Sequence, residues 1–280
     1  MRRFLPIILL LVLLGLAACY IVLGPRRASD EPRLSVHFID VGSGDCTLVR
    51  TPDERNVLID AGSADRSDHL ISHLSMQGVR RIDLLVIAHS DEDHIGGLPA
   101  VLDRFGISEV LDAAGSSSSA TYEQSIAKIR QRRIEYKTVA EDRRPNVSNC
   151  VDFEVLWPLQ SGTGDPIVIR FGYKDIGFLV VGNLLVDAEG RLLAEYHDLR
   201  STVLRVANHG DAGTTSNEFL QIVKPEYAVI SADAESESAQ PDQATLDRLS
   251  ACGAKVFRTD TNGDVVISTD GRRVWTEVAE

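Results

Sequence analysis

Residues 88–97, with the sequence A-H-S-D-E-D-H-I-G-G, restrict the fold of this chain more than any other stretch. They follow residues 82–87, an apolar run with the length of a buried strand. The two glycines at their end lead into an apolar run that begins like a helix at Leu98. The polar cluster therefore lies at the carboxyl end of a buried strand, where layered α/β proteins bind their ligands.

Four side chains in this stretch are of the types that bind divalent transition metals, namely His89, Asp91, Asp93 and His94. On one buried turn without partners, these groups would be strongly destabilising. A dinuclear metal site would remove that penalty, and the stretch therefore predicts one. The alternative interpretation is a solvent-exposed acidic turn, but such a turn seldom lies between a buried strand and a Gly-Gly helix start.

The same run resembles the H-x-[HD]-x-D-H signature of the metallo-β-lactamase fold. With aspartate at the third position and I-G-G-L at the end, it is similar to the hydrolase domain of the ComEC competence proteins and their stand-alone relatives. The resemblance covers about residues 34–275. It implies an α/β protein with the metallo-β-lactamase fold, an αββα four-layer sandwich of two mixed β-sheets flanked by helices.

Length and composition divide the 280 residues into three parts. Residues 1–24 are Met-Arg-Arg followed by an unbroken apolar run, and residues 25–33 are a polar linker. Residues 34–280 have the composition of a globular protein with a full core, and one large α/β domain accounts for their length. The resemblance makes this third part a metallo-β-lactamase-like hydrolase domain.

The N-terminal apolar run has two interpretations. It is long enough to cross a bilayer as an anchor helix. Alternatively, L-A-A-C at residues 16–19 resembles a bacterial lipoprotein signal, in which Cys19 would be lipidated after cleavage. The apolar residues 20–23 beyond it favour the anchor. Both interpretations tether the chain to a membrane, and we expect the catalytic domain to be extracytoplasmic, although arginines flank the run on both sides.

The net charge of −12 limits the partners of the chain. An acidic surface repels phosphate backbones and argues against a broad nucleic-acid surface, although a local basic groove stays open. The four cysteines contain no C-x-x-C pair, so the sequence predicts neither a disulfide framework nor a zinc ribbon.

The beginning of the domain also resembles the family. Residues 40–45 read D-V-G-S-G-D and residues 58–62 read L-I-D-A-G, with Ser43 where the family has glutamine. Asp60 ends a strand, and we expect it to accept backbone hydrogen bonds that hold the metal loop rather than to bind the metal. Asp45 is expected to contact the metal ligands without binding the metal itself.

The second half of the domain departs from the family at two metal positions. Asn183 stands where the family has the aspartate that bridges the two metals, and an amide brings no negative charge. Residues 207–216 resemble the H-H-G-S-x-x-S-S loop, in which His209 takes the place of the distal metal ligand and Asn208 replaces the first histidine. The amide of Asn183 is expected to weaken a dinuclear centre.

Four further residues are expected on the substrate side of the site: Asp165, Asp211, Thr214 and Gln240. Asp165 fills part of the place of an N-D-N-S segment, and Asp211 replaces a serine. Gln240 stands where relatives have a histidine near the substrate. Thr214 opens the segment 214–216, in which at least one hydroxyl is expected to cap the next helix.

The first functional hypothesis is a membrane-tethered, metal-dependent hydrolase. The resemblance implies that Asp93, His94 and His209 hold one ion, and that His89 and Asp91 hold a second with Asn183 between them. Asp93 and His94 are the residues expected to take part in catalysis. The cofactor would be a divalent metal, zinc or alternatively manganese, in one or two ions. A metal-bound hydroxide would attack a phosphodiester or other ester in a small ester or nucleic-acid fragment.

The second hypothesis is a catalytically impaired binding protein on the same scaffold, as Asn183 and Gln240 suggest. Outside the motif, His37 is expected to be a hydrogen-bonded strand histidine. His69 and His73 are expected to be surface residues of one helix. Asn262 and Gly263 are typical of a β-hairpin turn.

Overall fold

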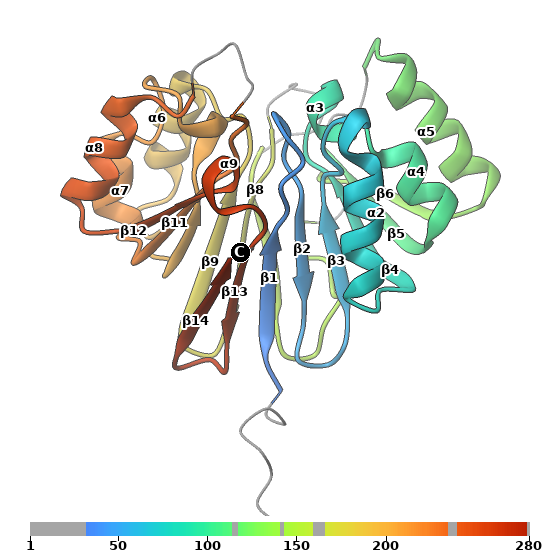
Figure 1. Ribbon diagram of the computed structural model, residues 1–280, viewed down its shortest axis with the longest axis horizontal. Coiled ribbons are helices and arrows are strands. Elements are labelled where there is room, and N and C mark those ends of the chain that lie inside the picture. The colour runs from blue at the N-terminus through green and yellow to red at the C-terminus, as the bar shows by residue number, and fades with distance from the viewer. Residues whose placement is uncertain (1–31, 114–116, 141–142, 159–165, 235–239, 279–280) are drawn as a thin grey trace, which may run out of the picture. The chain divides into compact units, whose positions relative to one another are not determined.

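The computed structural model describes residues 32–113, 117–140, 143–158, 166–234 and 240–278, in which two β-sheets lie face to face between two groups of helices (Figure 1). Residues Arg33–Glu280 form one compact unit. The apolar segment of residues 1–24 and the predicted site residue Asp165 lie outside the described residues.

The larger sheet has eight strands in the described residues, in the order β14-β13-β1-β2-β3-β4-β5-β6. They are β1 (Leu34–Phe38), β2 (Thr47–Arg50), β3 (Asn56–Ile59), β4 (Arg81–Ile87), β5 (Gly106–Asp112), β6 (Glu135–Thr138), β13 (Val265–Thr269) and β14 (Val274–Val278). Strands β3 to β6 are parallel to one another and the other neighbours are antiparallel, so this sheet is mixed.

The smaller sheet has six strands in the same described ranges, in the order β12-β11-β10-β9-β8-β7. They are β7 (Asp152–Trp157), β8 (Val168–Tyr173), β9 (Ile176–Val181), β10 (Val203–Arg205), β11 (Tyr227–Ile230) and β12 (Lys255–Arg258). Strands β9 to β12 are parallel, and β7 and β8 are antiparallel to their neighbours. Both sheets are therefore mixed, as the sequence predicts.

Helices cover the outer face of each sheet (Figure 1). The first group contains η1 (Ala64–Arg66), α2 (Ser67–Met76), α3 (Glu92–Ile95), α4 (Leu98–Arg104) and α5 (Ala120–Gln131). The second group contains α6 (Val186–Glu195), η2 (Ala207–Gly210), α7 (Asn217–Val223) and α8 (Gln243–Ala251), and α9 (Thr259–Asn262) leads from β12 to β13. This is the predicted αββα sandwich.

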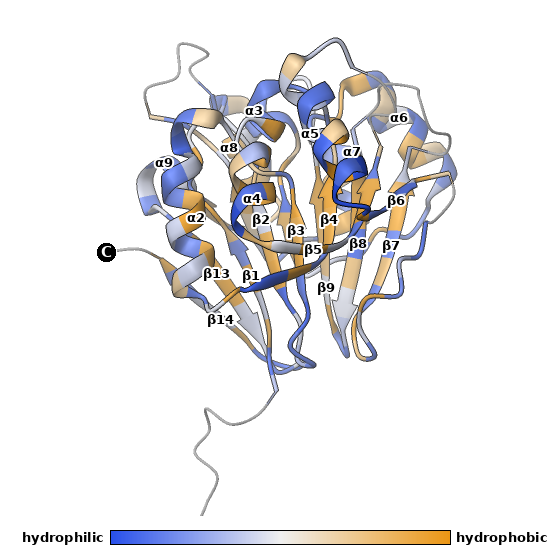
Figure 2. Cartoon of the chain, turned by 90° about the vertical axis from the view of Figure 1, so that its right-hand side faces the viewer, coloured by the Kyte–Doolittle hydropathy of each residue, from blue (hydrophilic) through white to orange (hydrophobic). Residues whose placement is uncertain are grey.

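Strand β4 shows why the chain forms four layers. Leu84 and Val86 pack in the core between the sheets, whereas Leu85 and Ile87 pack against the first group of helices. Both faces of the strand are buried, which explains its continuous apolar sequence. Figure 2 shows hydrophobic residues concentrated on the strands and hydrophilic residues on the outer faces of the helices.

The expectation that His73 lies on the surface is wrong. His73 is buried, and its Nε2 lies 3.1 Å from His37 Nδ1 while its Nδ1 lies 2.7 Å from Asp264 Oδ2. His69 Nε2 lies 3.0 Å from Asp264 Oδ1, with a more exposed side chain. The helix face that carries these two histidines packs on β1, where His37 also bonds Ser35, so the prediction of a hydrogen-bonded His37 is confirmed.

This network predicts a pH-dependent stability. Burial lowers the pKa of His37 to about 3, and the nearby charges of His73 and Arg50 act in the same direction against that of Asp264. His37 is therefore neutral in the folded protein, whereas the unfolded chain binds a proton there below an ordinary pKa of about 6.5. The contribution of His37 to the free energy of unfolding is complete above about pH 6.5 and falls as the pH drops towards about 3.

We expect His37→Gln to flatten the pH dependence of the unfolding free energy in this window by up to about 1.4 kcal/mol per pH unit. Urea unfolding at several pH values measures the slope. His197→Gln, in an exposed position, is the matched control. Identical slopes for the wild type and His37→Gln would contradict the lowered pKa of His37 in the folded protein.

The hairpin predicted at Asn262 and Gly263 is wrong. Strand β12 belongs to the smaller sheet, and β13 pairs with β1 and β14 in the larger sheet. Asn262 ends α9, its side chain accepts a hydrogen bond from Arg258 N, and Gly263 follows with a φ of 61°. The positive φ that Asn262-Gly263 predicts is therefore found at Gly263, where α9 ends and the chain passes to the other sheet.

Candidate metal centre

The candidate metal-site residues come from loops at the carboxyl ends of parallel strands in both sheets. Asp60 follows β3, His89 follows β4, Asn183 follows β9 and His209 follows β10. Such ends are where open α/β sheets bind ligands. Because the two sheets face each other, these loops meet at one edge of the sandwich.

Backbone hydrogen bonds join the loop after β1 to the metal loop. The amide of Asp45 donates to the carbonyl of Asp93 at 3.2 Å, and the amide of Gly62 donates to the carbonyl of Asp45 at 3.0 Å. Gly44 approaches so closely that a Cβ there would lie 1.9 Å from the carbonyl oxygen of Asp93. The glycine of the D-V-G-S-G-D motif is thus required by contact between two loops.

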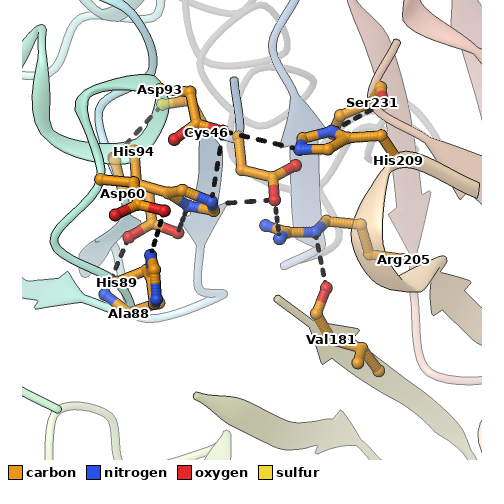
Figure 3. A network of polar contacts seen from close by, with 12 residues as sticks. Cys46, Asp60, Ala88, His89, Asp93, His94, Val181, Arg205, His209 and Ser231 are labelled. Carbon is orange, nitrogen blue, oxygen red and sulfur yellow. Dashed lines mark hydrogen bonds and ion pairs between the residues drawn. The ribbon is translucent and has the colours of Figure 1, made fainter. Parts of the chain in front are cut away.

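Asp60 fixes the orientation of His94. Its Oδ1 accepts a hydrogen bond from the amide of Ala88 at 2.8 Å, which is the backbone contact expected from its position at a strand end. Its Oδ2 lies 3.0 Å from Nδ1 of His94, a fully buried side chain (Figure 3). A carboxylate there fixes the proton on Nδ1 and leaves Nε2 as the free nitrogen.

Charges around His94 favour its protonated form in this structure. Burial lowers the pKa of His94, but the carboxylates of Asp60, Asp45 and Asp93 outweigh burial and raise it to about 9. A group of anions that attracts a proton so strongly also attracts a divalent cation. The electrostatics of the site therefore suit a cation between the imidazoles.

His94, Asp93 and His209 converge, although His209 is distant in the sequence. Oδ2 of Asp93 lies 3.8 Å from Nε2 of His94 and 3.8 Å from Nε2 of His209 (Figure 3). The Nδ1 of His209 lies 3.2 Å from the carbonyl oxygen of Ser231, which directs its Nε2 towards the site. His209 itself has a φ of 52°, and the following Gly210 has a φ of 81°.

His89 and Asp91 lie next to this group. Nδ1 of His89 is 3.2 Å from Oδ2 of Asp91, and the rings of His89 and His94 are 5.5 Å apart between centroids. Asp91 immediately precedes α3 in an extended conformation, and its side chain is 64% exposed. The structure thus places this pair at the outer side of the cluster.

Some ligand-type atoms of the site have no hydrogen-bond partner. Among the described residues, the buried unpaired atoms include Nε2 of His94, Nε2 of His209 and Oδ1 of Asn183. Buried polar atoms in proteins are almost always paired, so such a group calls for an explanation. Imidazole nitrogens, an amide oxygen and the Asp93 carboxylate together match the ligand chemistry of a divalent metal, so these residues fit such an ion.

Arg205 is a site residue that the sequence analysis missed. It is 1% exposed, and its position two residues after Val203 directs it between the sheets. Its Nη2 donates to Oδ2 of Asp45. Its Nε donates to the carbonyl of Val181 at 3.2 Å (Figure 3). Burial raises the pKa of Asp45, but the charge of Arg205 and then those of His209 and His94 lower it below its ordinary value. The sequence did contain a sign of this role, because Arg205 is a charged residue in the otherwise apolar strand β10.

Residues 39–234 match the sequence profile described as the metallo-beta-lactamase superfamily. The chain belongs to the metallo-β-lactamase superfamily. The family and the fold that the sequence indicates are both confirmed.

Two curated relatives match most of this metallo-β-lactamase-fold chain, and one of them is a competence protein by name. ComE operon protein 3 of Bacillus subtilis (strain 168) is 28% identical over 253 residues, which are 82% of this chain and 32% of that protein. Competence protein ComA of Neisseria gonorrhoeae is 31% identical over 243 residues, 85% of this chain and 32% of that protein. The chain therefore spans 32% of the length of each relative.

A solved structure shows the same fold. Zn(2+)-bound PqqB from Methylobacterium extorquens matches with a TM-score of 0.53 and 12% identity over 76% of this chain and 85% of that chain.

No helix in the described ranges of this metallo-β-lactamase-fold chain has the length and apolar character that crossing a bilayer requires.

A cavity of about 240 Å³ is lined in part by two of the candidate metal ligands, Asp93 and His209. Its lining residues are Ser43, Asp93, Asn183, Asn208, His209, Ala232, Asp233 and Gln240. Ser43, where the family has glutamine, donates a hydrogen bond to Oδ2 of Asp233 at 2.7 Å. Asn183 and Gln240 thus share one cavity with His209.

A second cavity, of about 430 Å³, shares Asn208 with the first. Its lining includes Asp211 and Thr214, but Thr214 is 2% exposed and its hydroxyl contacts the carbonyls of Ala207 and Asp211. The substrate-side role of these two residues stays a prediction.

Glu189 of α6 is a second residue that the sequence did not reveal. It is buried, and its carboxylate accepts hydrogen bonds from the amide of Thr215 at 2.6 Å and the amide of Ser216 at 3.0 Å. Ser216 caps α7 through the amide of Phe219, which confirms the predicted cap. Glu189 therefore fixes the end of the loop that begins at His209.

Proposed function

We propose that this chain is a metal-dependent hydrolase that acts on a phosphodiester or another ester. The observation that supports the proposal best is the pair of buried, unpaired Nε2 atoms of His94 and His209, both 3.8 Å from the carboxylate of Asp93. Membership of a superfamily that binds divalent metals supports the same conclusion.

The residues have distinct tasks in this proposal. Asp93, His94 and His209 would hold one ion; His89 and Asp91 would hold a second, with Asn183 between the two. Asp60 holds the proton of His94 on Nδ1 and so presents Nε2. Divalent ions bound there would lower the pKa of a water molecule and stabilise the charge that develops on the ester. Zinc suits these nitrogen and oxygen ligands, and manganese is the alternative.

The charge around the site favours a small ester as substrate. Asp233 lines the cavity next to the metal cluster, and Asp187 and Asp211 line the neighbouring one. With a net charge of −12, the chain repels a long phosphate backbone. A short nucleic-acid fragment or another small ester meets less of this repulsion than a polynucleotide does.

We propose in addition that the N-terminal apolar segment tethers the domain to a membrane, with the domain on the extracytoplasmic side. The run after Arg3 has the length of a bilayer-spanning helix. Fractionation of the full chain and of a chain without residues 1–24 tests the tether. Membrane retention of Cys19→Ala is the expected result for an anchor helix, and its release would indicate lipidation.

The direct test of the hydrolase is metal content and turnover. The purified full chain is loaded with zinc or manganese, its ions per chain are counted, and bis(p-nitrophenyl) phosphate is offered as substrate. Bound metal with turnover is the expected result. A chain that binds no metal and turns over nothing would favour the second candidate, a binding protein, which the amide of Asn183 in place of a carboxylate supports.

Asn183→Asp is expected to raise both metal content and kcat/KM. The substitution adds a negative charge beside Asp93 and His209 in the same cavity, which favours a second cation. Asn217→Asp, at the exposed start of α7, is the control for added charge. A fall from measurable activity would show that the amide functions as it stands, and no change in metal content would contradict the expectation.

A further inference from the structure

Asp45 offers the cluster a carboxylate that is not among the predicted metal ligands. One oxygen of Asp45, one nitrogen of His94 and one nitrogen of His209 all lie within 4.8 Å of one another. Asp45 is 3% exposed and reaches this place from the loop between β1 and β2.

We propose that Asp45 is a metal ligand that acts with His94, His209 and Asp93, and that it supplies the negative charge that Asn183 lacks. This inference rests on the metal-binding part of the proposed function. It assigns to Asp45 direct contact with the ion instead of a supporting role behind the ligands.

Charge balance is the first argument. A divalent ion, the carboxylates of Asp93 and Asp60 and the guanidinium of Arg205 together carry a net charge of +1, because the two carboxylates offset the ion and the guanidinium remains. Asn183 and the imidazoles add no charge as ligands. The carboxylate of Asp45 makes this group neutral. Asp91 is poorly suited to this task, because its side chain is 64% exposed and paired with His89.

Arg205 supplies the second argument. Its Nη2 donates to Oδ2 of Asp45 and its Nε to the carbonyl of Val181, so the side chain of Asp45 is fixed in direction. A carboxylate has two oxygens and about four acceptor positions, so the bond from Arg205 leaves acceptor capacity for an ion. Ligand carboxylates are commonly held by such hydrogen bonds.

Metal titration of three variants tests the inference. The apo forms of the full chain are titrated with Zn²⁺ by calorimetry and with Co²⁺ by visible absorption, and circular dichroism checks their folding. Asp45→Asn is expected to weaken the affinity for the first ion by more than about a hundredfold, beyond the roughly 10–100-fold that loss of a supporting residue costs, and to change the Co²⁺ spectrum. Asn183→Ala is expected to have the smaller effect on both.

The double variant Asp45→Asn with Arg205→Met separates a ligand role from a purely structural one. It removes the buried ion pair as a whole, which proteins tolerate far better than loss of one partner. Weak metal binding by the folded double variant supports the inference, and wild-type affinity would overturn it. If the wild type binds no ion, the proposed function fails; if the wild type and the folded Asp45→Asn chain bind equally, this inference alone fails.

Discussion

His94→Ala is expected to abolish hydrolysis and to remove the ion that Asp93 and His209 help to hold. The effect on kcat/KM should exceed the roughly 10–100-fold loss caused by removing a supporting residue behind a metal ligand. The reason is geometric: Nε2 of His94 is buried, has no hydrogen-bond partner and lies 3.8 Å from Asp93 Oδ2.

Turnover of bis(p-nitrophenyl) phosphate and the number of ions per chain measure this effect. His197→Ala is the matched control, because it removes an exposed imidazole from the same domain. His209→Gln provides an independent check from the other sheet, since its Nδ1 contacts a backbone carbonyl and the change leaves no buried carboxylate unpaired. Wild-type turnover by a folded His94→Ala chain would exclude hydrolysis at this site.

Arg205→Met is expected to have the largest effect on stability. Asp45 and Arg205 are 3% and 1% exposed, so the substitution leaves a buried carboxylate without its cation. Breaking a buried pair in this way costs about 3–5 kcal/mol. In the wild type the charge of Arg205 lowers the pKa of Asp45, so this carboxylate is ionised at neutral pH. In the variant that charge is gone and burial raises the pKa, so Asp45 must stay charged without its partner or take up a proton, and both are unfavourable.

Urea unfolding at neutral pH, in the absence of metal, measures this change. The control is Arg55→Met, because Arg55 is 48% exposed in its pair with Asp83 and such pairs contribute at most about 1 kcal/mol. Asp45→Asn combined with Arg205→Met is expected to lose less stability than Arg205→Met alone. Equal losses for the single and the double variant would show that the packing of Arg205, and not its charge, stabilises the fold.

The strands with clear apolar patterns are predictable from the sequence. The predicted run 82–87 is found in β4, and the strand expected to end at Asp60 is β3, whose last residue is Ile59. Strand β6 was not predicted, because its sequence E-Y-K-T has no apolar alternation and no residue in it is fully buried. It is an edge strand that exists because β5 offers it a parallel partner.

The sequence identifies the ligand types of the site, but not the groups that support them. His89, Asp93 and His94 stand out because they are adjacent in one motif. Arg205 and Glu189 act through hydrogen bonds with loops far away in the sequence. Residue spacing carries no information about such contacts, because they depend on how the two sheets face each other.

The division of the cluster between two sheets has a mechanical consequence. Asp93 and His94 belong to the larger sheet's loops, and His209 to a loop of the smaller sheet. An ion held by all three would connect the loops of the two sheets. Because such an ion binds only when the two sheets are packed together, tighter binding of the ion would also stabilise the packing of one sheet on the other. Chelation would in that case loosen the whole domain, well beyond the loops that touch the ion.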